Sequence, residues 1–261
     1  MEHWAGRVVL VTGASAGIGY AIAETLARNG MHVIGCARRS EKIEELAKSF
    51  KPASGDKGKI TAIKCDLTDE MDILAMFERI QKEFKHVDVL INNAGVGLPD
   101  DLLTGQSEKW RQMLELNVLA LSICTREALR LMKEAGIDDG HIININSMLG
   151  HRDVPMAFVH FYGSTKHMTV ALTKALNAEL RQQKSHIRVT SISPGLVESE
   201  FMAVRMANSD QNLADQLKNF SMANQAATLK SQDVADSVLY VLSTPPHVNI
   251  RELQITATEY A

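Results

Sequence analysis

The sequence predicts a doubly wound α/β domain, and two patterns along the chain are the reason. Short runs rich in Val and Ile alternate with longer segments whose apolar residues recur at helical spacing. Most of the short runs are apolar on both sides, as strands must be when helices cover both faces of a parallel sheet. We therefore expect a parallel sheet of about seven strands with helices on both faces.

This alternation gives the order of the expected elements. The predicted strands are residues 8–12, 32–36, 59–64, 87–92, 141–147, 187–193 and 252–256. The predicted helices are residues 18–29, 40–48, 71–83, 107–135, 164–182 and 231–242. Thr68, Ser107 and Ser231 stand before helices as capping residues, and Gly30 and Gly136 stand where helices end.

One domain is expected over residues 1–261. An α/β sheet of this length commonly stays a single domain, and no repeat, low-complexity tract or Pro/Ser linker divides the chain. Residues 198–230 interrupt the alternation and are rich in Met, Ala and Asn. A connection this long inside a compact domain is typical of a lid or a binding loop.

Composition and charge exclude several classes of protein. A hydrophobic fraction of 45% and a charged fraction of 23% are typical of globular domains and argue against disorder. The net charge of -3 provides no basic surface for nucleic acid or an anionic membrane. No apolar stretch approaches the ~20 residues of a membrane-spanning helix, and no signal peptide precedes the first strand. We expect a cytoplasmic protein.

The three cysteines, Cys36, Cys65 and Cys124, are scattered along the chain. They form no CxxC pair and match no His/Cys spacing of a metal site, so we expect no metal. They are interpreted as buried small hydrophobic residues. An odd, scattered count also favours a reducing compartment over a secreted disulfide scaffold.

A glycine-rich turn follows the first predicted strand and opens the first predicted helix. Gly13 can supply the tight turn, Gly17 lets the backbone approach a pyrophosphate, and Gly19 permits close helix packing. The order GxxxGxG departs from the general GxGxxG fingerprint of Rossmann folds, and a glycine turn without a ligand is the alternative. The predicted phosphate site consists of Gly13, Ala14, Ser15, Ala16, Gly17, Ile18 and Gly19.

The end of the second predicted strand is where a Rossmann fold contacts the adenine ribose, about 20 residues beyond the glycine turn. Enzymes that use NAD place an acid there, whereas this chain has Arg38 and Arg39. Forked guanidinium groups suit a 2′-phosphate. The sequence therefore favours NADP(H), although a solvated arginine pair at the next helix is the alternative.

Three polar residues predict an acid/base site. Tyr162 and Lys166 lie four apart at the start of a helical segment, so both side chains project from one helix face. A free tyrosine has a pKa of about 10, and a nearby ammonium group moves it toward neutrality. Ser147 ends the fifth strand, at the edge where open α/β sheets bind ligands. Alone, each feature is weak, because such pairs occur by chance and serine is an ordinary turn residue.

Taken in order, the motifs resemble the classical short-chain dehydrogenases/reductases over nearly the whole chain. The motifs are Thr12-Gly13-x-x-x-Gly17-x-Gly19, Asp66-Leu67, Asn92-Asn93-Ala94-Gly95, Asn117, Ser147, Tyr162-x-x-x-Lys166 and Pro194-Gly195. Residues 36–39, 122–128, 138–148, 160–162 and 245–248 are also similar to the group that contains the SDR family member 11 and farnesol dehydrogenase-like enzymes.

The resemblance implies a role for each of four catalytic residues. Tyr162 would be the general acid/base, and Ser147 would polarise the substrate carbonyl. Lys166 would lower the pKa of the phenol and hold the nicotinamide ribose. Asn117 would lie at a helix irregularity whose backbone binds a proton-relaying water. His151, although near the site in sequence, is expected to be a structural or surface residue.

The resemblance also implies the remaining cofactor contacts. Asp66 and Leu67 would flank the adenine, and Asn93 would line the cofactor cleft. Four later residues would pass the nicotinamide: Pro194, Gly195, Val197 and Ser199. Here the chain departs from the family pattern: many members have threonine directly after Pro-Gly-x-Val, where this chain has Glu198 and then Ser199.

The function implied is NADP(H)-dependent hydride transfer between an alcohol and a carbonyl, without nucleic-acid partners and in a homodimer or homotetramer. An apolar substrate such as farnesol or a steroid is favoured by apolar residues near the site, which could instead pack the lid onto the sheet. These are Met148, Leu149, Met156, Phe158, Phe201, Met202, Met206, Phe220 and Met222. The alternatives are an NADP(H)-sensing protein without turnover and a purely structural interaction protein.

Overall fold

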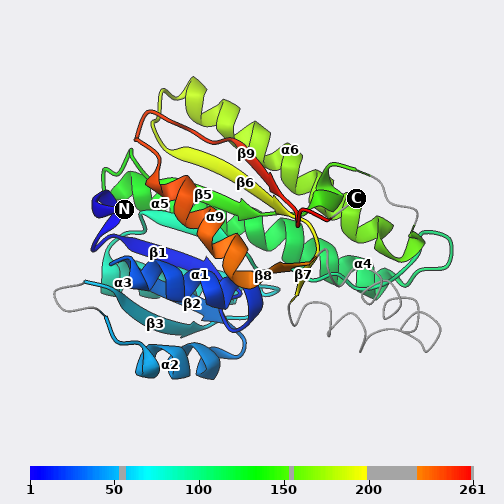
Figure 1. Ribbon diagram of the computed structural model, residues 1–261, viewed down its shortest axis with the longest axis horizontal. Coiled ribbons are helices and arrows are strands. Elements are labelled where there is room, and N and C mark those ends of the chain that lie inside the picture. The colour runs from blue at the N-terminus through cyan, green and yellow to red at the C-terminus, as the bar shows by residue number, and fades with distance from the viewer. Residues whose placement is uncertain (53–56, 153–155, 199–227, 260–261) are drawn as a thin grey trace.

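The centre of the computed structural model is a seven-stranded parallel sheet (Figure 1), and the structure describes residues 1–52, 57–152, 156–198 and 228–259. The strands are β1 (Val8–Thr12), β2 (His32–Ala37), β3 (Lys59–Lys64), β4 (Val89–Asn92), β5 (His141–Ile145), β6 (Arg188–Pro194) and β9 (Glu252–Ile255). Their spatial order is β3-β2-β1-β4-β5-β6-β9, which confirms the predicted doubly wound Rossmann fold. The order reverses between β1 and β4, the point where such sheets bind ligands.

Helices cover both faces of the sheet. The helices are α1 (Gly17–Arg28), α2 (Ser40–Ser49), α3 (Glu70–Phe84), α4 (Ser107–Leu114), α5 (Leu121–Glu134), α6 (His160–Gln182) and α9 (Ser231–Ser243). Apolar residues of α1, α2 and α9 pack on one face, and those of α3, α5 and α6 pack on the other. In the described part of the chain, no helix combines the length and apolar character needed to cross a membrane.

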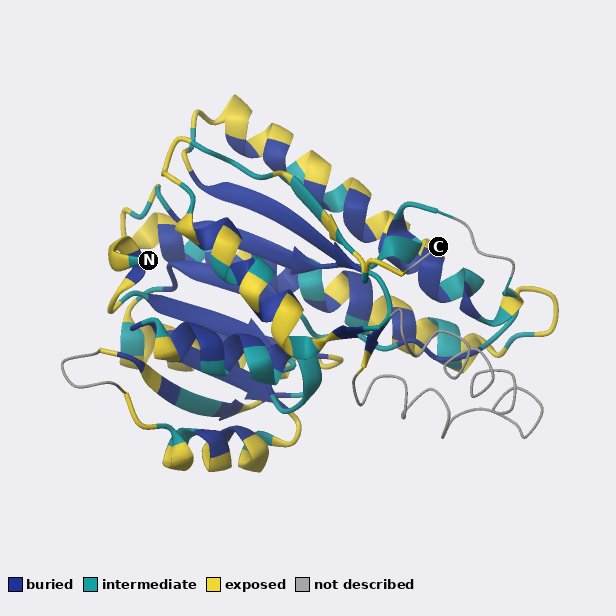
Figure 2. Cartoon of the chain, viewed as in Figure 1, coloured by how far each residue is buried: buried dark blue, intermediate teal, exposed yellow. Residues whose placement is uncertain are grey.

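The strand residues alternate between two cores, as the pleat requires. Val9 and Val11 of β1 belong to the cluster under α1 and α9, whereas Val8 and Leu10 belong to the cluster under α3 and α5. The sheet is accordingly the most buried layer of the molecule (Figure 2). Strand β3 corrects the prediction that it is buried on both sides: its end residues are exposed because it forms one edge of the sheet.

Two helices differ from their predicted extent. The predicted helix 107–135 is interrupted by a π-helical segment, η2 (Glu115–Ala120), which separates α4 from α5. Helix α6 starts at His160, one turn before the predicted residue 164, and therefore includes Tyr162. Both differences fall in the part of the chain that carries the candidate site.

The predicted caps are partly wrong. Asp69, and not Thr68, caps α3: its carboxylate accepts a hydrogen bond from the Met71 amide, while the Thr68 hydroxyl is bonded to Asp66. Ser107 and Ser231 are the first residues of α4 and α9 and are not their N-caps, which are Gln106 and Lys230. Gly30 and Gly136 have φ angles of 84° and 69° just beyond their helices, as predicted for helix ends.

Cys36, Cys65 and Cys124 are free and buried, as predicted, and burial raises the pKa of the Cys65 thiol to about 12. Within the described residues, no group of His, Cys, Asp or Glu side chains is placed to hold a metal. Most of the predicted lid, residues 199–227, lies outside the described residues; its first and last residues form the short strands β7 (Val197–Glu198) and β8 (Leu229–Lys230).

Candidate active site

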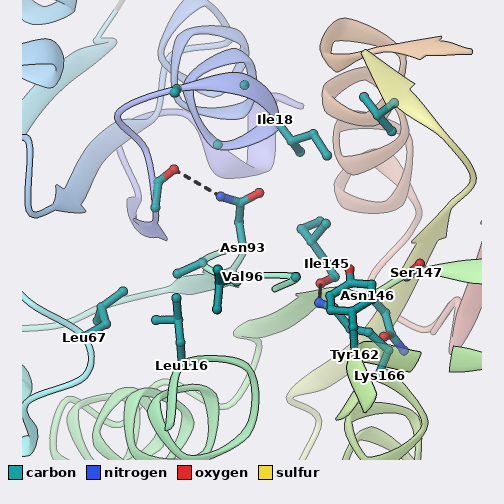
Figure 3. Close-up of a pocket in the computed structure, with 18 of the residues that line it drawn as sticks. Ile18, Leu67, Asn93, Val96, Leu116, Ile145, Asn146, Ser147, Tyr162 and Lys166 are labelled. Atoms are coloured by element: carbon teal, nitrogen blue, oxygen red, sulfur yellow. Dashed lines mark hydrogen bonds between the residues drawn. The ribbon is translucent and has the colours of Figure 1, made fainter. Parts of the chain in front are cut away.

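A cavity of about 770 Å³ opens along the carboxyl edge of the sheet, from the glycine turn to helix α6 (Figure 3). Most of the predicted site residues line it. They are Gly13, Ser15, Ala16, Gly17, Ile18, Gly19, Arg38, Arg39, Asp66, Leu67, Asn93, Ser147, Tyr162, Lys166, Pro194, Gly195 and Val197. The fold therefore brings residues from 13 to 197 into one site.

The glycine turn is built for close approach of backbone to ligand. Gly13 and Gly17 have φ angles of 68° and 54°, which side-chain-bearing residues rarely adopt. A Cβ on Gly19 would lie 2.3 Å from the carbonyl oxygen of Gly13, so only glycine lets helix α1 start this near the turn. No side chain caps the first amides of α1, which leaves them available to an anion. The turn therefore fits a dinucleotide pyrophosphate.

Ala14 is the exception within the predicted phosphate site. Its side chain is fully buried in the core, and its amide donates to the carbonyl of Cys36 over 3.2 Å. The amide of Gly13 donates to the same carbonyl over 2.9 Å. These two amides are already bonded to β2, so the amides that follow are the ones left for an anion. A contact between Ala14 and a cofactor stays a prediction.

One end of the cavity, next to the end of β2, holds the charged residues of the predicted adenine site. Arg38 and Arg39 line the cavity just after β2, opposite Asp66 and Leu67. The amide and hydroxyl of Thr68 donate to the Asp66 carboxylate, and with the positive charge of Arg38 they lower its pKa. Asp66 is thus held as an anion in a fixed orientation.

Asn93 ties the loop after β4 to the glycine turn. Its side-chain amide donates to the carbonyl oxygens of Thr12 and Gly13, over 2.8 and 3.2 Å. Figure 3 shows one of these bonds as a dashed line from Asn93. In return, the Thr12 hydroxyl accepts from the backbone amides of Asn93 and Ala94, both over 3.0 Å. Thr12 is therefore a site-building residue that the sequence prediction missed, because its partners lie about 80 positions away.

Tyr162 and Lys166 share one face of α6 at the other end of the cavity (Figure 3). The Lys166 Nζ lies 5.8 Å from the centre of the Tyr162 ring and donates to the carbonyl oxygen of Ile145 over 3.1 Å. Burial lowers the pKa of Lys166 from 10.5 to about 8. The predicted pairing of a phenol with an amine is therefore present, in a site that penalises charge.

Ser147 lies two residues beyond the end of β5, which stops at Ile145 and not at the predicted residue 147, and it faces the same end of the cavity. It caps a 3-10 turn, η3 (Met148–Gly150), and its hydroxyl oxygen accepts from the Leu149 amide over 3.1 Å. One lone pair of the oxygen is used in this way, which leaves the hydroxyl proton free to point into the cavity.

Asn117 lies in the π-helical segment η2 and does not line the cavity. Its side-chain amide bonds both backbone groups of Val96, over 2.8 and 2.9 Å, and also donates to the Thr165 hydroxyl. The side chain thus joins the loop after β4 to helix α6 one residue before Lys166. A helix irregularity at Asn117, implied by the family resemblance, is present; π segments of this kind are frequent at functional sites.

The far wall of the cavity is formed by the end of β6 and the residues after it, including Pro194, Gly195 and Val197. Ser199 lies outside the described residues. The helical residues Arg111, Gln112, Glu115 and Leu116 also line the cavity, and sequence reasoning did not identify them. Their spacing over one helix turn was the available signal, but nothing in the sequence told which face of that helix meets the cavity.

Comparison with known proteins places this site in a family. Residues 7–210 match the family described as short chain dehydrogenase. The chain belongs to the short-chain dehydrogenase/reductase family. It is 52% identical to dehydrogenase/reductase SDR family member 11 of Gallus gallus, over 99% of each chain. It is 41% identical to farnesol dehydrogenase of Aedes aegypti, over 98% of this chain and 97% of that protein.

Solved structures of short-chain dehydrogenases/reductases share the fold. A serine dehydrogenase complexed with NADP+ is 33% identical, with a TM-score of 0.82 over 97% of this chain and 96% of that one. A metagenomic short-chain oxidoreductase in complex with NADP is 28% identical, with a TM-score of 0.76 over 97% of each. The chain is therefore an oxidoreductase of this family by both sequence and structure.

Proposed function

We propose that this chain is an NADP(H)-dependent oxidoreductase that interconverts an alcohol and a carbonyl. The observation that carries the proposal is that Ser147, Tyr162 and Lys166 line the same cavity as the glycine turn. A dinucleotide that extends from the turn toward β5 brings its reactive end to the three polar side chains. A bound NADPH supplies the hydride, and the chain supplies orientation, charge and the proton.

Each polar side chain then has a defined role in carbonyl reduction. The Tyr162 hydroxyl donates a proton to the carbonyl oxygen, and the Ser147 hydroxyl donates a hydrogen bond to the same oxygen. The Lys166 ammonium stabilises the phenolate and holds the ribose. The Asn117 side chain joins the loop after β4, the segment η2 and helix α6. Its backbone binds the water that relays protons toward Lys166. Alcohol oxidation uses the same groups in the opposite direction.

The preference for NADP(H) is proposed from the adenine end of the cavity. Arg38 and Arg39 follow β2 where enzymes that use NAD carry an acid. Guanidinium groups bind a 2′-phosphate through charge-assisted, forked hydrogen bonds. The solved relative complexed with NADP+ supports this choice. Asp66 and Leu67 flank the adenine, and Pro194, Gly195, Val197 and Ser199 pass the nicotinamide.

The substrate proposed is an apolar alcohol or carbonyl compound, such as farnesol or a steroid. Met148, Leu149, Met156 and Phe158 line the cavity beside Ser147 and Tyr162, and they provide an adaptable apolar wall. The 41% identity to a farnesol dehydrogenase supports an isoprenoid alcohol. The remaining predicted apolar residues, in 201–222, lie outside the described residues.

We further propose that residues 1–261 form one domain, that 198–230 cover the substrate, and that the protein is a cytoplasmic homodimer or homotetramer. Three large apolar side chains on α4, η2 and α6 support the assembly, because between 41% and 47% of their surface is exposed. They are Leu114, Leu119 and Met168.

The proposal is tested with a panel of farnesol, a ketosteroid and a small polar ketone, each assayed with NADP(H) and with NAD(H). Turnover of the apolar compounds with NADP(H) is the expected result. Preference for the polar ketone would refute the apolar substrate alone. Tight binding of NADPH, seen by its fluorescence, without turnover of any carbonyl compound would favour the sensing protein, which the intact Ser147, Tyr162 and Lys166 argue against.

A further inference from the structure

Ser147 caps the turn η3, which is too short to be stable without contacts to the rest of the protein. The turn η3 has three residues, Met148–Gly150, and helical turns of this length have little intrinsic stability. Ser147 is its N-cap, and Met148 and Leu149 of the turn also line the cavity. Something outside the turn must therefore fix the direction of the Ser147 hydroxyl.

The residue that closes η3 reaches two strands at once. His151 is the C-cap of the turn, and its amide donates to the Met148 carbonyl over 3.1 Å. Its imidazole Nε2 lies 2.9 Å from the Oγ of Ser193 on β6 and 2.7 Å from the Oε1 of Glu252 on β9. One ring thus connects the turn to the fully buried Ser193 and to a carboxylate from the end of the chain.

The contact with Glu252 is largely shielded from water. The side chains of His151 and Glu252 are 15% and 28% exposed, so their attraction is screened less than that of a surface pair. A single N–H on Nε2 can point at only one oxygen. The hydrogen bond of Nε2 is with the Ser193 hydroxyl, and Glu252 Oε1 lies within ion-pair distance of the same nitrogen. Strands β6 and β9 are themselves paired, with Ser191 opposite Glu252.

On its other side, the turn packs against helix α6, which carries Tyr162 and Lys166. A Cβ on Gly150 would lie 2.9 Å from the carbonyl oxygen of Lys166 and 3.2 Å from the side-chain Nδ2 of Asn146. The turn therefore has no free space between α6 and the strands. A shift of η3 would alter the distance between the Ser147 hydroxyl and the groups on α6.

We propose that His151 is a positioning residue for Ser147. Together with Ser193 and Glu252, it holds the turn η3 against the sheet. His151 does not line the cavity, so it acts through the turn and not on the substrate. The inference rests on the proposed function, in which Ser147 binds the carbonyl oxygen. A misplacement of about 1 Å at such a group can cost about 100-fold in rate.

The first test is the variant His151→Leu, which removes both polar contacts. We expect kcat for carbonyl reduction to fall about 10- to 100-fold, while the Kd of NADPH changes less than about 2-fold, because the glycine turn and the arginines are untouched. His86→Leu is the matched control: His86 also contacts a carboxylate, with Nε2 3.2 Å from Asp88, but at the opposite edge of the sheet. Equal losses of kcat in the two variants would overturn the proposal.

Two conservative variants separate positioning from general packing. The contacts use Nε2, and the amide of glutamine reaches about as far as Nε2, whereas that of asparagine reaches only as far as Nδ1. His151→Gln should recover most of kcat, and His151→Asn should not. If both variants behave like His151→Leu although they fold and bind NADPH, the side-chain contacts do not position the turn.

The decisive test is a double-mutant cycle with Ser147, followed by single-turnover oxidation of NADPH so that slow rates can be measured. In the Ser147→Ala background, His151→Leu should change the rate less than about 2-fold, because the hydroxyl that it positions is gone. Independent, multiplicative losses would overturn the inference while leaving the proposed function intact. A wild-type protein that reduces no carbonyl compound would overturn both.

Discussion

The ammonium group of Lys166 donates to the backbone carbonyl of Ile145 over 3.1 Å and is shielded from solvent by the surrounding chain. Burial is the cause of its lowered pKa, about 8 instead of 10.5, and no carboxylate in the described residues offsets it. A neutral carbonyl thus holds the charge that the phenol of Tyr162 requires. This arrangement ties the stability of the protein to pH.

Lys166→Met should therefore change how stability depends on pH. A lysine with a depressed folded pKa destabilises the protein below that pKa, and the penalty disappears as pH rises through the unfolded value. The shift from 10.5 to about 8 corresponds to about 3 kcal/mol near pH 7 and to about half of that near pH 9.5. Urea unfolding without cofactor measures the difference between variant and wild type.

The free energy of unfolding of wild type, relative to that of Lys166→Met, should rise by about 1 to 2 kcal/mol between pH 7 and pH 9.5. Any constant cost of losing the bond to Ile145 cancels from this comparison. Lys174→Met on the same helix is the control, since Lys174 is exposed to solvent, and it should show no such trend. A gap for Lys166→Met that is independent of pH would mean that the folded and unfolded proteins bind the same number of protons at Lys166, so that burial does not lower its pKa.

Replacing both Arg38 and Arg39 by alanine should weaken NADPH binding about 10- to 100-fold and NADH binding less than about 2-fold. Charge-assisted hydrogen bonds of about 1.5–3 kcal/mol to the 2′-phosphate account for the loss. Fluorescence titration with each cofactor measures both affinities. Arg28→Ala, which removes an exposed guanidinium paired with Glu24 on α1, should change neither. Equal weakening of NADPH and NADH would contradict the 2′-phosphate role.

Gly19→Ala should abolish NADPH binding and destabilise the fold. The added Cβ would lie 2.3 Å from the Gly13 carbonyl oxygen and 2.4 Å from the side-chain Nδ2 of Asn93. The glycine turn and the loop after β4 would therefore have to separate. Gly136→Ala is the matched control, because nothing lies within 4 Å of its Cβ and only its φ of 69° is strained. It should cost about 1 kcal/mol and leave NADPH affinity unchanged. Retained NADPH affinity in Gly19→Ala would remove the turn from the cofactor site.

The sequence predicted those features that arise from local patterns. Alternating strands and helices, the glycine turn and the Tyr162–Lys166 spacing all depend on residues close together in the chain, and the structure has all three. Strand order and helix faces were not predictable in this way, because they depend on pairings between distant residues. The cavity-lining face of α4 is an example.

Backbone groups explain most of what sequence reasoning missed at the site. The partner of Lys166 is the carbonyl of Ile145, the partner of Asn117 is the backbone of Val96, and the amide of Ala14 is bonded to the carbonyl of Cys36. Every residue has the same backbone groups, so none of these contacts has a sequence signature. The extent of η2 was missed for the same reason.

The central claim is that Tyr162 transfers the proton to and from the substrate oxygen. Tyr162→Phe keeps the ring that packs with Leu98 and Met113 and removes only the hydroxyl. Single-turnover reduction of a carbonyl substrate, followed by NADPH absorbance in enzyme with measured NADPH affinity, tests the claim most directly. We predict a loss of at least about 1,000-fold in rate with NADPH affinity unchanged within about 3-fold. A variant that still reduces the carbonyl at a rate near that of wild type would contradict the account.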